Sequence, residues 1–305
     1  MKRTILLAMM VSLFAVGAYA QKAPKRQGTT ECLNLETLYG DVESVTVSQL
    51  SRESDSSSKF TVWLEQTHKF NKRGDLLEMQ PTMLDFAKIQ HSYNSQGQLI
   101  KTTFSNLTTN EAWWIKTYSY DANGNEIKCL QYSGSGKSVD FKTYTKYYAK
   151  NKPASIISYD AYGGICYKKL FYYDKYGRLI KEKEEKEVEI TISRYKYDSK
   201  GRVIEYDDCN PDNTIISKTL YTYDAKGNKI EEKRCGVDGT LYEKSTYKYN
   251  ANNKIIEKIE YDRDDQPERK SVYKYDSIGN IIEIEIYDKD GTPSSKYKHQ
   301  IVYRK

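Results

Sequence analysis

A short pattern recurs along most of this chain: an aromatic residue, then Asp or Asn, two variable positions and glycine. Internal repetition constrains the fold more than any other sequence feature, because each copy must adopt one local structure and pack against its neighbours. The copies begin at Phe70, Tyr93, Tyr120, Tyr173, Tyr197, Tyr223, Tyr249 and Tyr275, with a degenerate copy at Tyr148. Their aromatic residues are 23 to 28 positions apart, and 26 apart in the last three intervals. The sequence therefore predicts a tandem array of about nine similar units.

The repeated pattern has the chemistry of a tight turn. Asp or Asn at its second position accepts a hydrogen bond from the backbone two residues later. Glycine at the fifth position supplies the left-handed backbone that closes a type I turn with a glycine bulge, a common connection in β-hairpins. The copy at Tyr249 carries Asn253 in place of glycine, and asparagine tolerates positive φ better than most residues. Each copy is therefore predicted to form the tip of a β-hairpin.

A second, looser turn lies between successive copies, at 133–136, 160–163, 210–213, 236–239 and 288–291. The segments between turns alternate polar and apolar residues with period two and are rich in Tyr, Ile, Val and Thr, as strands require. Both kinds of turn, with a serine-rich bend at 55–58, predict about 20 antiparallel strands, the first at 42–47. The predicted fold is all-β, with tandem two-stranded hairpin repeats that form a long, curled or spiral β-meander sheet.

Two apolar columns are predicted, one on each face of the sheet. Tyr-x-Tyr pairs form the first column, at Tyr118/Tyr120, Tyr195/Tyr197, Tyr221/Tyr223, Tyr247/Tyr249 and Tyr273/Tyr275. The second column contains Leu77, Ile100, Ile127, Ile180, Ile204, Ile230, Ile256 and Ile282. We expect Tyr275 to lie opposite Ile281 and Lys274 opposite Ile282. Because both faces are apolar in part, the sheet is expected to curl so that one face is covered.

The N-terminus has the three parts of a secretory signal peptide: Lys2 and Arg3, an apolar stretch at 5–17, and a small-x-small sequence at 18–20. We therefore expect a signal peptide at 1–20, Sec-type export, and a periplasmic, cell-surface or secreted protein. Residues 21–36 are predicted to be a disordered leader. Residues 37–305 are predicted to form one domain, irregular at 37–115 and regular at 116–305. No segment reaches the roughly 20 apolar residues of a membrane span, so none is predicted.

Charge and cysteine content exclude several classes of protein. The net charge of +6 falls by two when Lys2 and Arg3 leave with the signal. Lysine and glutamate alternate without a basic stripe, so no nucleic-acid partner is predicted. The five cysteines are odd in number and match no metal-site spacing. Cys209 and Cys235 lie two strands apart, roughly 9.5 Å, which exceeds the ~7 Å limit for a disulfide; we predict no bridge between them.

The aromatic-Asp-x-x-Gly copies resemble the YD-repeat family, also called Rhs repeats, over about 70–305. The resemblance implies an extended antiparallel sheet that coils into a spiral or shell. It also implies an exported or surface protein, of a kind associated with carbohydrate binding or with shells around toxins. The chain is short and ends on a strand at 296–303, so it is most similar to the small, stand-alone exported bacterial members.

Few residues stand out as carriers of chemistry. His68 and His91 occupy positions that tyrosine takes in other repeats, so they are expected in the aromatic column and not as general bases. No catalytic residue, metal site or cofactor is predicted. Two Asp-rich turns, at 262–265 and 288–291, begin like calcium loops but lack the other ligands. The candidate ligand-binding residues are Trp113, Trp114, Tyr221, Tyr223, Tyr247, Tyr249, Tyr273 and Tyr275.

These observations favour an exported, non-enzymatic repeat protein that serves as a binding or structural module at the cell envelope. Extended repeat sheets offer large surfaces, which suit a polysaccharide or an envelope protein as partner. One alternative is a carbohydrate-binding protein that uses the tyrosine-rich face. Another is a toxin-related, Rhs-like interaction or shell component. The adjacent Trp113 and Trp114 are expected to point to opposite faces, so that one packs inward.

Overall fold

The computed structural model describes residues 38–52, 59–80, 87–134, 136–149 and 151–305. The predicted signal peptide at 1–20, the leader at 21–36 and the serine-rich bend at 55–58 lie outside the described residues, as does Cys32.

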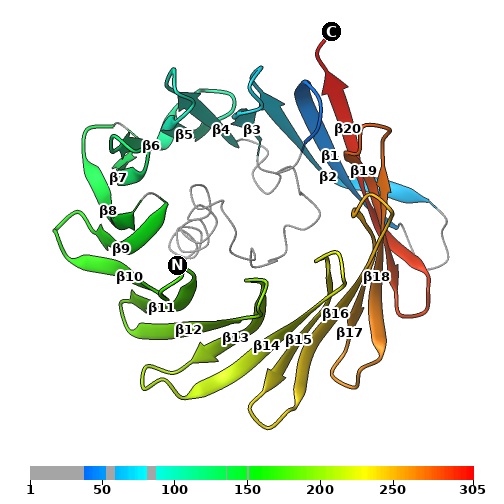
Figure 1. Ribbon diagram of the computed structural model, residues 1–305. Helices are drawn as coiled ribbons and strands as arrows, with labels where there is room; N and C mark the ends of the chain where they lie inside the picture. The colour runs from blue at the N-terminus through cyan, green and yellow to red at the C-terminus, as the bar shows by residue number, and fades with distance from the viewer. Residues whose placement is uncertain (1–37, 53–58, 81–86, 135, 150) are drawn as a thin grey trace.

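Twenty strands make up the described chain (Figure 1). They are β1 (Val42–Arg52), β2 (Phe60–Phe70), β3 (Leu76–Met79), β4 (Ala87–Tyr93), β5 (Leu99–Asn106), β6 (Ala112–Tyr120), β7 (Glu126–Ser133), β8 (Val139–Ala149), β9 (Lys152–Tyr159), β10 (Ile165–Tyr173), β11 (Leu179–Lys186), β12 (Glu189–Tyr197), β13 (Val203–Cys209), β14 (Ile215–Tyr223), β15 (Lys229–Gly236), β16 (Leu241–Tyr249), β17 (Ile255–Tyr261), β18 (Pro267–Tyr275), β19 (Ile281–Asp288) and β20 (Pro293–Tyr303). The predicted all-β meander of about 20 antiparallel strands is confirmed, although β1 extends five residues beyond the expected end at 47.

The sheet closes on itself. Each strand pairs antiparallel with the next along the chain, and β1 pairs antiparallel with β20, so the curled sheet is a barrel and not an open spiral (Figure 1). At this seam Val45 lies between His68 of β2 and Ile301 of β20 and is fully buried. Arg304 follows β20 and binds the backbone oxygens of Val42 and Phe70, which ties the chain end across β1 to β2.

The predicted turn chemistry is confirmed. In the copy that follows Tyr120, the amide of Gly124 donates to the Asp121 carbonyl (3.0 Å), and the amide of Asp121 donates to the Asn125 carbonyl (2.9 Å). The Asp121 carboxylate accepts from the amides of Asn123 and Asn125. Gly124 has φ 80°, and Asn253, which replaces glycine in another copy, has φ 58°. The left-handed position is therefore required at every tip, and asparagine can fill it.

A one-residue bulge beside each tip changes one predicted pairing. Tyr275 lies opposite Ile281 as expected, but Lys274 pairs with Glu283, so the expected pairing of Lys274 with Ile282 is wrong. Ile282 is the extra residue of the bulge and does not take a place in the ladder. The equivalent residues are exposed to nearly the same extent, 37–39%: Leu77, Ile100, Ile127, Ile180, Ile204, Ile256 and Ile282.

The degenerate copy is shifted by one residue. Tyr147 pairs with Pro153, and its hydroxyl group makes the contact that the column tyrosines make in other repeats. Tyr148, which the sequence pattern selected, is instead 69% exposed. A second register shift between Tyr147 and Ala149 absorbs the additional residue.

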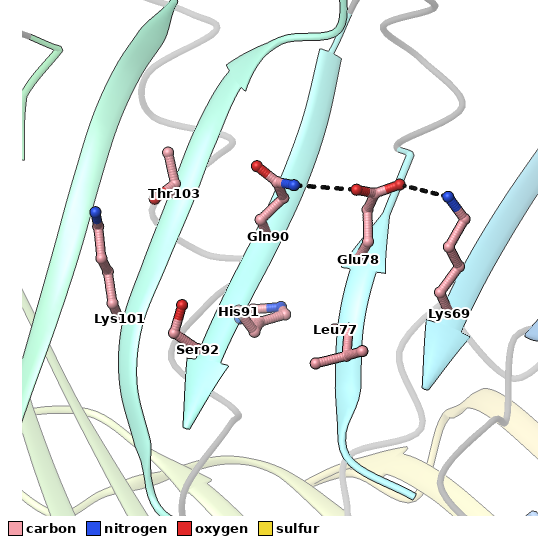
Figure 2. A pocket seen from close by; sticks show the side chains of 8 residues that line it. All are labelled: Lys69, Leu77, Glu78, Gln90, His91, Ser92, Lys101 and Thr103. Carbon is pink, nitrogen blue, oxygen red and sulfur yellow. Dashed lines mark hydrogen bonds and ion pairs between the residues drawn. The ribbon is translucent and has the colours of Figure 1, made fainter. Parts of the chain in front are cut away.

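The two faces of the wall differ. Figure 2 views β2–β5 from outside the barrel, with Lys69, Glu78 and Gln90 pointing toward the viewer. Following the strand pairing from these residues, we call their side the outer face and the opposite side, which carries the tyrosine column, the inner face. Lysines on the outer face such as Lys69 and Lys248 are 58% and 68% exposed, whereas Lys258 on the inner face is 9% exposed.

Cys129, Cys166, Cys209 and Cys235 are all unpaired, so the prediction of no Cys209–Cys235 disulfide is confirmed. Strand β14 separates the strands that carry Cys209 and Cys235. Over the described ranges, no helix is long and apolar enough to span a bilayer.

Candidate functional site

The most regular feature of the inner face is a ladder of tyrosine hydroxyl groups. One tyrosine in each repeat donates to a backbone carbonyl at the start of the preceding strand, over 2.6–3.0 Å. The pairs are Tyr93–Leu76, Tyr120–Leu99, Tyr147–Glu126, Tyr173–Pro153, Tyr197–Leu179, Tyr223–Val203, Tyr249–Lys229 and Tyr275–Ile255. Burial raises the pKa of Tyr249 and of Tyr275 to about 12. These hydroxyls therefore remain protonated and serve as fixed donors between repeats.

This ladder divides the six candidate tyrosines into two rows. Tyr223, Tyr249 and Tyr275 belong to the ladder, and their hydroxyl groups are used in holding the wall together. Tyr221, Tyr247 and Tyr273 form a second row, two residues earlier on each strand. The ladder row therefore has a structural role on the inner face.

The second row is accompanied by charged groups. The Lys229 ammonium lies between two of its rings, 4.8 Å from the centroid of Tyr247 and 5.7 Å from that of Tyr221. Lys229 also forms an ion pair with Glu232 (2.5 Å), and Glu232 accepts a hydrogen bond from the Tyr247 hydroxyl (3.4 Å). Tyr247 is only 5% exposed, whereas Tyr221 and Tyr273 are half-buried. A ligand on this face would meet mainly Tyr221 and Tyr273.

A polar network that the sequence pattern did not reveal crosses β12–β15 on the same face. The Tyr206 hydroxyl bridges Ser193 (2.9 Å) and Asp208 (2.6 Å), and Asp208 also accepts from Ser217 (3.2 Å). Arg234 approaches this group loosely, 3.5 Å from Asp208. Tyr206 lies on the inner face in β13, the strand that leads into a loose turn, and is not part of the repeated Tyr-x-Tyr pairs. Its departure from the repeat was the one signal that could have identified it.

The tryptophan pair lies on another part of the wall. Trp113 and Trp114 both contact Phe104, with ring centroids 4.9 Å and 5.3 Å away, and pack against the cluster that includes Ile89. The expectation that they point to opposite faces is wrong, because a bulge between Phe104 and Ser105 breaks the alternation. Strand β6 is far from β14–β18 around the ring, so the tryptophans and the candidate tyrosines are not brought together (Figure 1).

The histidines join the aromatic column as expected. His91 Nδ1 lies 3.0 Å from the Thr102 hydroxyl, which in turn lies 3.2 Å from that of Tyr118. His68 is buried at the seam, and desolvation followed by the nearby His299 lowers its pKa to about 4. At neutral pH, His68 is therefore an uncharged packing residue.

A hollow of about 480 Å³ opens on the outer face between β2 and β5, where β3 is only four residues long (Figure 2). Glu78 lines it and accepts from Lys69 (2.9 Å) and Gln90 (3.1 Å). The bond from Lys69 is the main reason that the pKa of Glu78 is lowered. A carboxylate held as an acceptor in this way can orient a hydroxyl-bearing ligand.

The Asp-rich turns show turn chemistry. Asp262 accepts from the amides of Asp264 and Gln266, and Asp288 accepts from the amide of Thr292. Within the described ranges, no group of three or more His, Cys, Asp or Glu residues is placed to hold a metal ion.

Comparison with solved structures gives distant likenesses. The crystal structure of TcdB2-TccC3-Cdc42 has a TM-score of 0.41 and 16% identity, over 84% of this chain and 15% of that chain. TcdB2-TccC3 without its hypervariable C-terminal region gives 0.42 and 14%, over 82% and 14%. A porin-like protein from Bacteroides uniformis gives 0.36 and 10%, over 87% and 99%. The chain thus spans about one seventh of the TcdB2-TccC3 chains, and every TM-score is below 0.5.

The family assignment comes from the sequence. No curated protein matches the chain. The family model described as Teneurin YD-shell matches residues 52–216, which is just over half of the chain. The matched segment contains most of the aromatic-Asp-x-x-Gly tips and the first rungs of the tyrosine ladder, so the expected YD-repeat membership is confirmed. The chain belongs to the Teneurin YD-shell family.

Proposed function

We propose that this protein is an exported, non-enzymatic binding or structural module of the cell envelope. The observation that carries the proposal is the tyrosine ladder. The hydroxyl groups of the most repeated side chains form hydrogen bonds between repeats. A wall built in this way offers broad surfaces on both faces, which suit extended partners better than a small substrate.

Export is tested by fractionation of the native cells together with N-terminal sequencing of the mature protein. We expect the mature chain to begin at Gln21 and to leave the cytoplasm. Retention in the cytoplasm with an intact Met1 would exclude an envelope role, whatever the protein binds.

A second candidate function is carbohydrate binding by the inner face. The second-row tyrosines favour it. Tyr221 and Tyr273 are half-buried, and Tyr221 lies 5.7 Å from the Lys229 ammonium, whose ion pair with Glu232 offers groups that can hydrogen-bond to sugar hydroxyls. The test is affinity electrophoresis through gels that contain neutral polysaccharides, with the Tyr221→Ala/Tyr273→Ala variant beside the wild type. Retardation that disappears in this variant supports the inner face, and equal mobility with and without every polysaccharide contradicts it.

A toxin-related shell or interaction component is the remaining alternative, and the closed wall is the observation that favours it. Cross-linking in the native envelope, followed by purification under denaturing conditions, is the appropriate test. A single envelope protein linked stoichiometrically to this chain would favour the alternative over polysaccharide binding.

A further inference from the structure

The strand register separates charges that are mixed along the sequence. At outer-face positions of β7–β11 that are paired in register, the basic residues are Lys128, Lys142, Lys146, Lys168, Lys181 and Lys183, and the one acidic residue is Glu185. At the equivalent positions of β15–β19, the basic residues are Lys233, Lys244, Lys248, Lys270 and Lys274, and the acidic residues are Glu231, Glu257, Glu283 and Glu285. The outer face is therefore strongly basic over β7–β11 and nearly neutral over β15–β19.

Two exposed lysines of β8 have no carboxylate at the positions paired with them. Lys142 lies opposite Leu130 of β7 and Tyr159 of β9. Lys146 lies opposite Ser155 of β9. The lysines of nearby strands carry the same charge, and like charges on neighbouring strands are destabilising. These charges therefore gain nothing from within the wall, which indicates that they serve a partner outside it.

The other lysines have a small share of carboxylate. Glu185 is shared by two of them, Lys183 at 2.8 Å and Lys168 at 3.6 Å. The balance changes at the next strand pair around the ring, because Lys196 of β12 lies 2.7 Å from Glu205 of β13. The basic region therefore ends at β12, and we call the outer face of β7–β12 the basic sector.

Exposed tyrosine rings accompany the lysines of the basic sector. Tyr144 and Tyr172 are 39% and 40% exposed. The Lys128 ammonium lies 5.9 Å from the centroid of the Tyr144 ring. The Lys181 ammonium similarly lies 5.4 Å from the centroid of the Tyr172 ring. Ammonium groups and aromatic rings are therefore neighbours on this part of the wall.

The same combination continues onto the rim of the barrel that carries the aromatic-Asp-x-x-Gly turns, which we call the tight-turn rim. Tyr148 at the end of β8 is exposed, and Tyr176 at the tip between β10 and β11 is 70% exposed. The Tyr148 ring meets that of Tyr173 edge-on at 6.1 Å, and the Lys175 ammonium lies 5.0 Å from the Tyr176 centroid. Two exposed rings therefore extend the basic sector beyond the wall at this rim.

The loose turns at the other end of the same strands differ in charge. Tyr162, between β9 and β10, is 98% exposed, and Val188, between β11 and β12, is fully exposed. Each of these apolar tips has an acidic neighbour in its turn, Asp160 for the first and Glu187 for the second. An anionic partner would therefore be repelled at the loose-turn rim and attracted at the tight-turn rim.

We propose that the basic sector, together with Tyr148 and Tyr176 on the tight-turn rim, docks on a membrane surface that contains anionic lipids. Lysines close to an anionic headgroup layer are attracted to it, and tyrosine rings favour the boundary between headgroups and acyl chains. The lysines extend over five strands, roughly 20 Å of wall, which suits a two-dimensional array of headgroups.

The exposed rings at the rim favour a membrane over a soluble acidic polymer. A polymer would be held by the charged wall alone, whereas apolar rings that project from a rim contribute to binding when they enter a bilayer. The inference rests on the proposed role as an exported envelope module, because export brings the chain to an envelope membrane.

The test is flotation of the full mature chain with vesicles in a density gradient at ~0.15 M salt. One set of vesicles contains about 30% phosphatidylglycerol in phosphatidylcholine, and the other contains phosphatidylcholine alone. We expect the wild type to float with the anionic vesicles and to remain at the bottom with the neutral ones. The variant Lys142→Gln/Lys146→Gln should bind about 30-fold more weakly. The control Lys248→Gln/Lys298→Gln, at equally exposed lysines outside the basic sector, should stay within about twofold of the wild type.

A second pair of variants tests the orientation. Tyr148→Ser/Tyr176→Ser removes the rings of the tight-turn rim and should weaken binding at least about fivefold. Tyr162→Ser/Val188→Ser removes two apolar tips of the same hairpins at the loose-turn rim and should leave binding unchanged. The reverse order of effects would place the membrane at the wrong rim and would overturn the proposal.

Thermal unfolding of each variant, followed by circular dichroism, separates a loss of binding from a loss of structure. Equal weakening by the two lysine variants would mean that only net charge matters and would overturn the proposal. Retention on heparin beads without flotation on anionic vesicles would overturn it in favour of an acidic polymer. If the wild type floats with neither kind of vesicle but the mature chain is found in the envelope fraction of the cells, the lipid surface is rejected and the envelope module stands.

Discussion

At the scale of single residues, the repeat tyrosine has two separate roles. Its ring covers the inner face, and its hydroxyl group donates to a carbonyl of the previous hairpin, as Tyr223 does to Val203 over 2.7 Å. The sequence pattern reveals only the role of the ring, because Phe70 takes the same position in its copy as the tyrosines take in theirs. The hydroxyl contact explains why tyrosine, and not phenylalanine, dominates the repeat.

Replacing Tyr223 by phenylalanine tests this role. The change removes the donor and leaves the Val203 carbonyl without its side-chain partner, so the free energy of unfolding should fall by about 1 kcal/mol. Urea denaturation followed by circular dichroism measures the change. Tyr172→Phe, on the exposed outer face, is the control and should be nearly neutral; an equal loss in both variants would contradict the ladder.

Glu126 gives a pH-dependent prediction at the same scale. Burial raises the pKa of its carboxyl to about 7, with Lys116 only partly opposing the shift. The folded-state pKa lies above the unfolded value. The contribution of the protonated Glu126 carboxyl to the free energy of unfolding is therefore present at low pH and is lost as the pH rises through about 7. Glu126→Gln should therefore unfold at a higher temperature than the wild type at pH 8, with a much smaller difference at pH 5. Differential scanning calorimetry at both values checks the sign.

At the scale of elements, the seam formed by β20, β1 and β2 is the place where the chain ends meet. Val42, Val45, Val47 and Phe70 form its core, with Tyr303 packed against them. His68 and His299, both 6% exposed, lie on either side of β1 within this apolar surrounding. The Nε2 atom of His68 is buried without a hydrogen-bond partner, so a proton there would be costly.

The seam should therefore be acid-sensitive. The pKa of His68 is depressed to about 4, so the stability that its neutral form contributes is complete above about pH 6.5 and is lost as the pH falls toward 4. Hydrogen exchange of amides in β1 and β20 should accelerate at pH 4.5 relative to pH 7, more than exchange in β14. His68→Gln should remove most of this acid effect, whereas His91→Gln, in β4, should leave it in place. An unchanged seam in acid would refute the prediction.

The sequence predicted these elements well where the repeat is regular and less well where an additional residue enters. The tips, strand number and Tyr275–Ile281 pairing follow from local chemistry, since Asp and Gly act within five residues. The bulge at Ile282 and the shift from Tyr148 to Tyr147 do not follow from local chemistry, because a bulge depends on hydrogen bonds across strands. The Trp113/Trp114 error has the same cause.

At the scale of the whole molecule, closure depends on the parity of the strand count. A meander of antiparallel strands returns to its first strand in antiparallel orientation only if the number of strands is even, and twenty satisfies this condition. The wall can therefore lose or gain complete repeats, since each repeat contributes two strands, but not single strands.

Deleting residues 224–249, which contain β15 and β16, should give a folded barrel of eighteen strands. The join brings Tyr223 to Asn250, which restores the aromatic-Asn sequence of the tip, and barrel diameter falls roughly in proportion to strand number. Small-angle scattering should show a smaller cross-section, with β circular dichroism and cooperative unfolding retained. Deleting 237–249 removes β16 alone and leaves an odd number of strands, so that variant should aggregate or unfold. Equal stability of the two deletion variants would refute the requirement for an even number of strands.

The sequence by itself determined the class of fold, the positions of the tips, the approximate number of strands and the residues that share a face, because all of these follow from hydrogen bonding and alternation within a few residues. Only the tertiary structure decided that β1 meets β20, that the tyrosine column faces inward, and that the basic residues of β7–β12 gather on one part of the outer face. Those properties depend on curvature and on pairing between strands distant in sequence, which no local pattern encodes. Lysine and glutamate alternate along the chain, but the strand register places them on different strands and faces. Positive and negative residues that are mixed in the sequence are therefore separated on the surface.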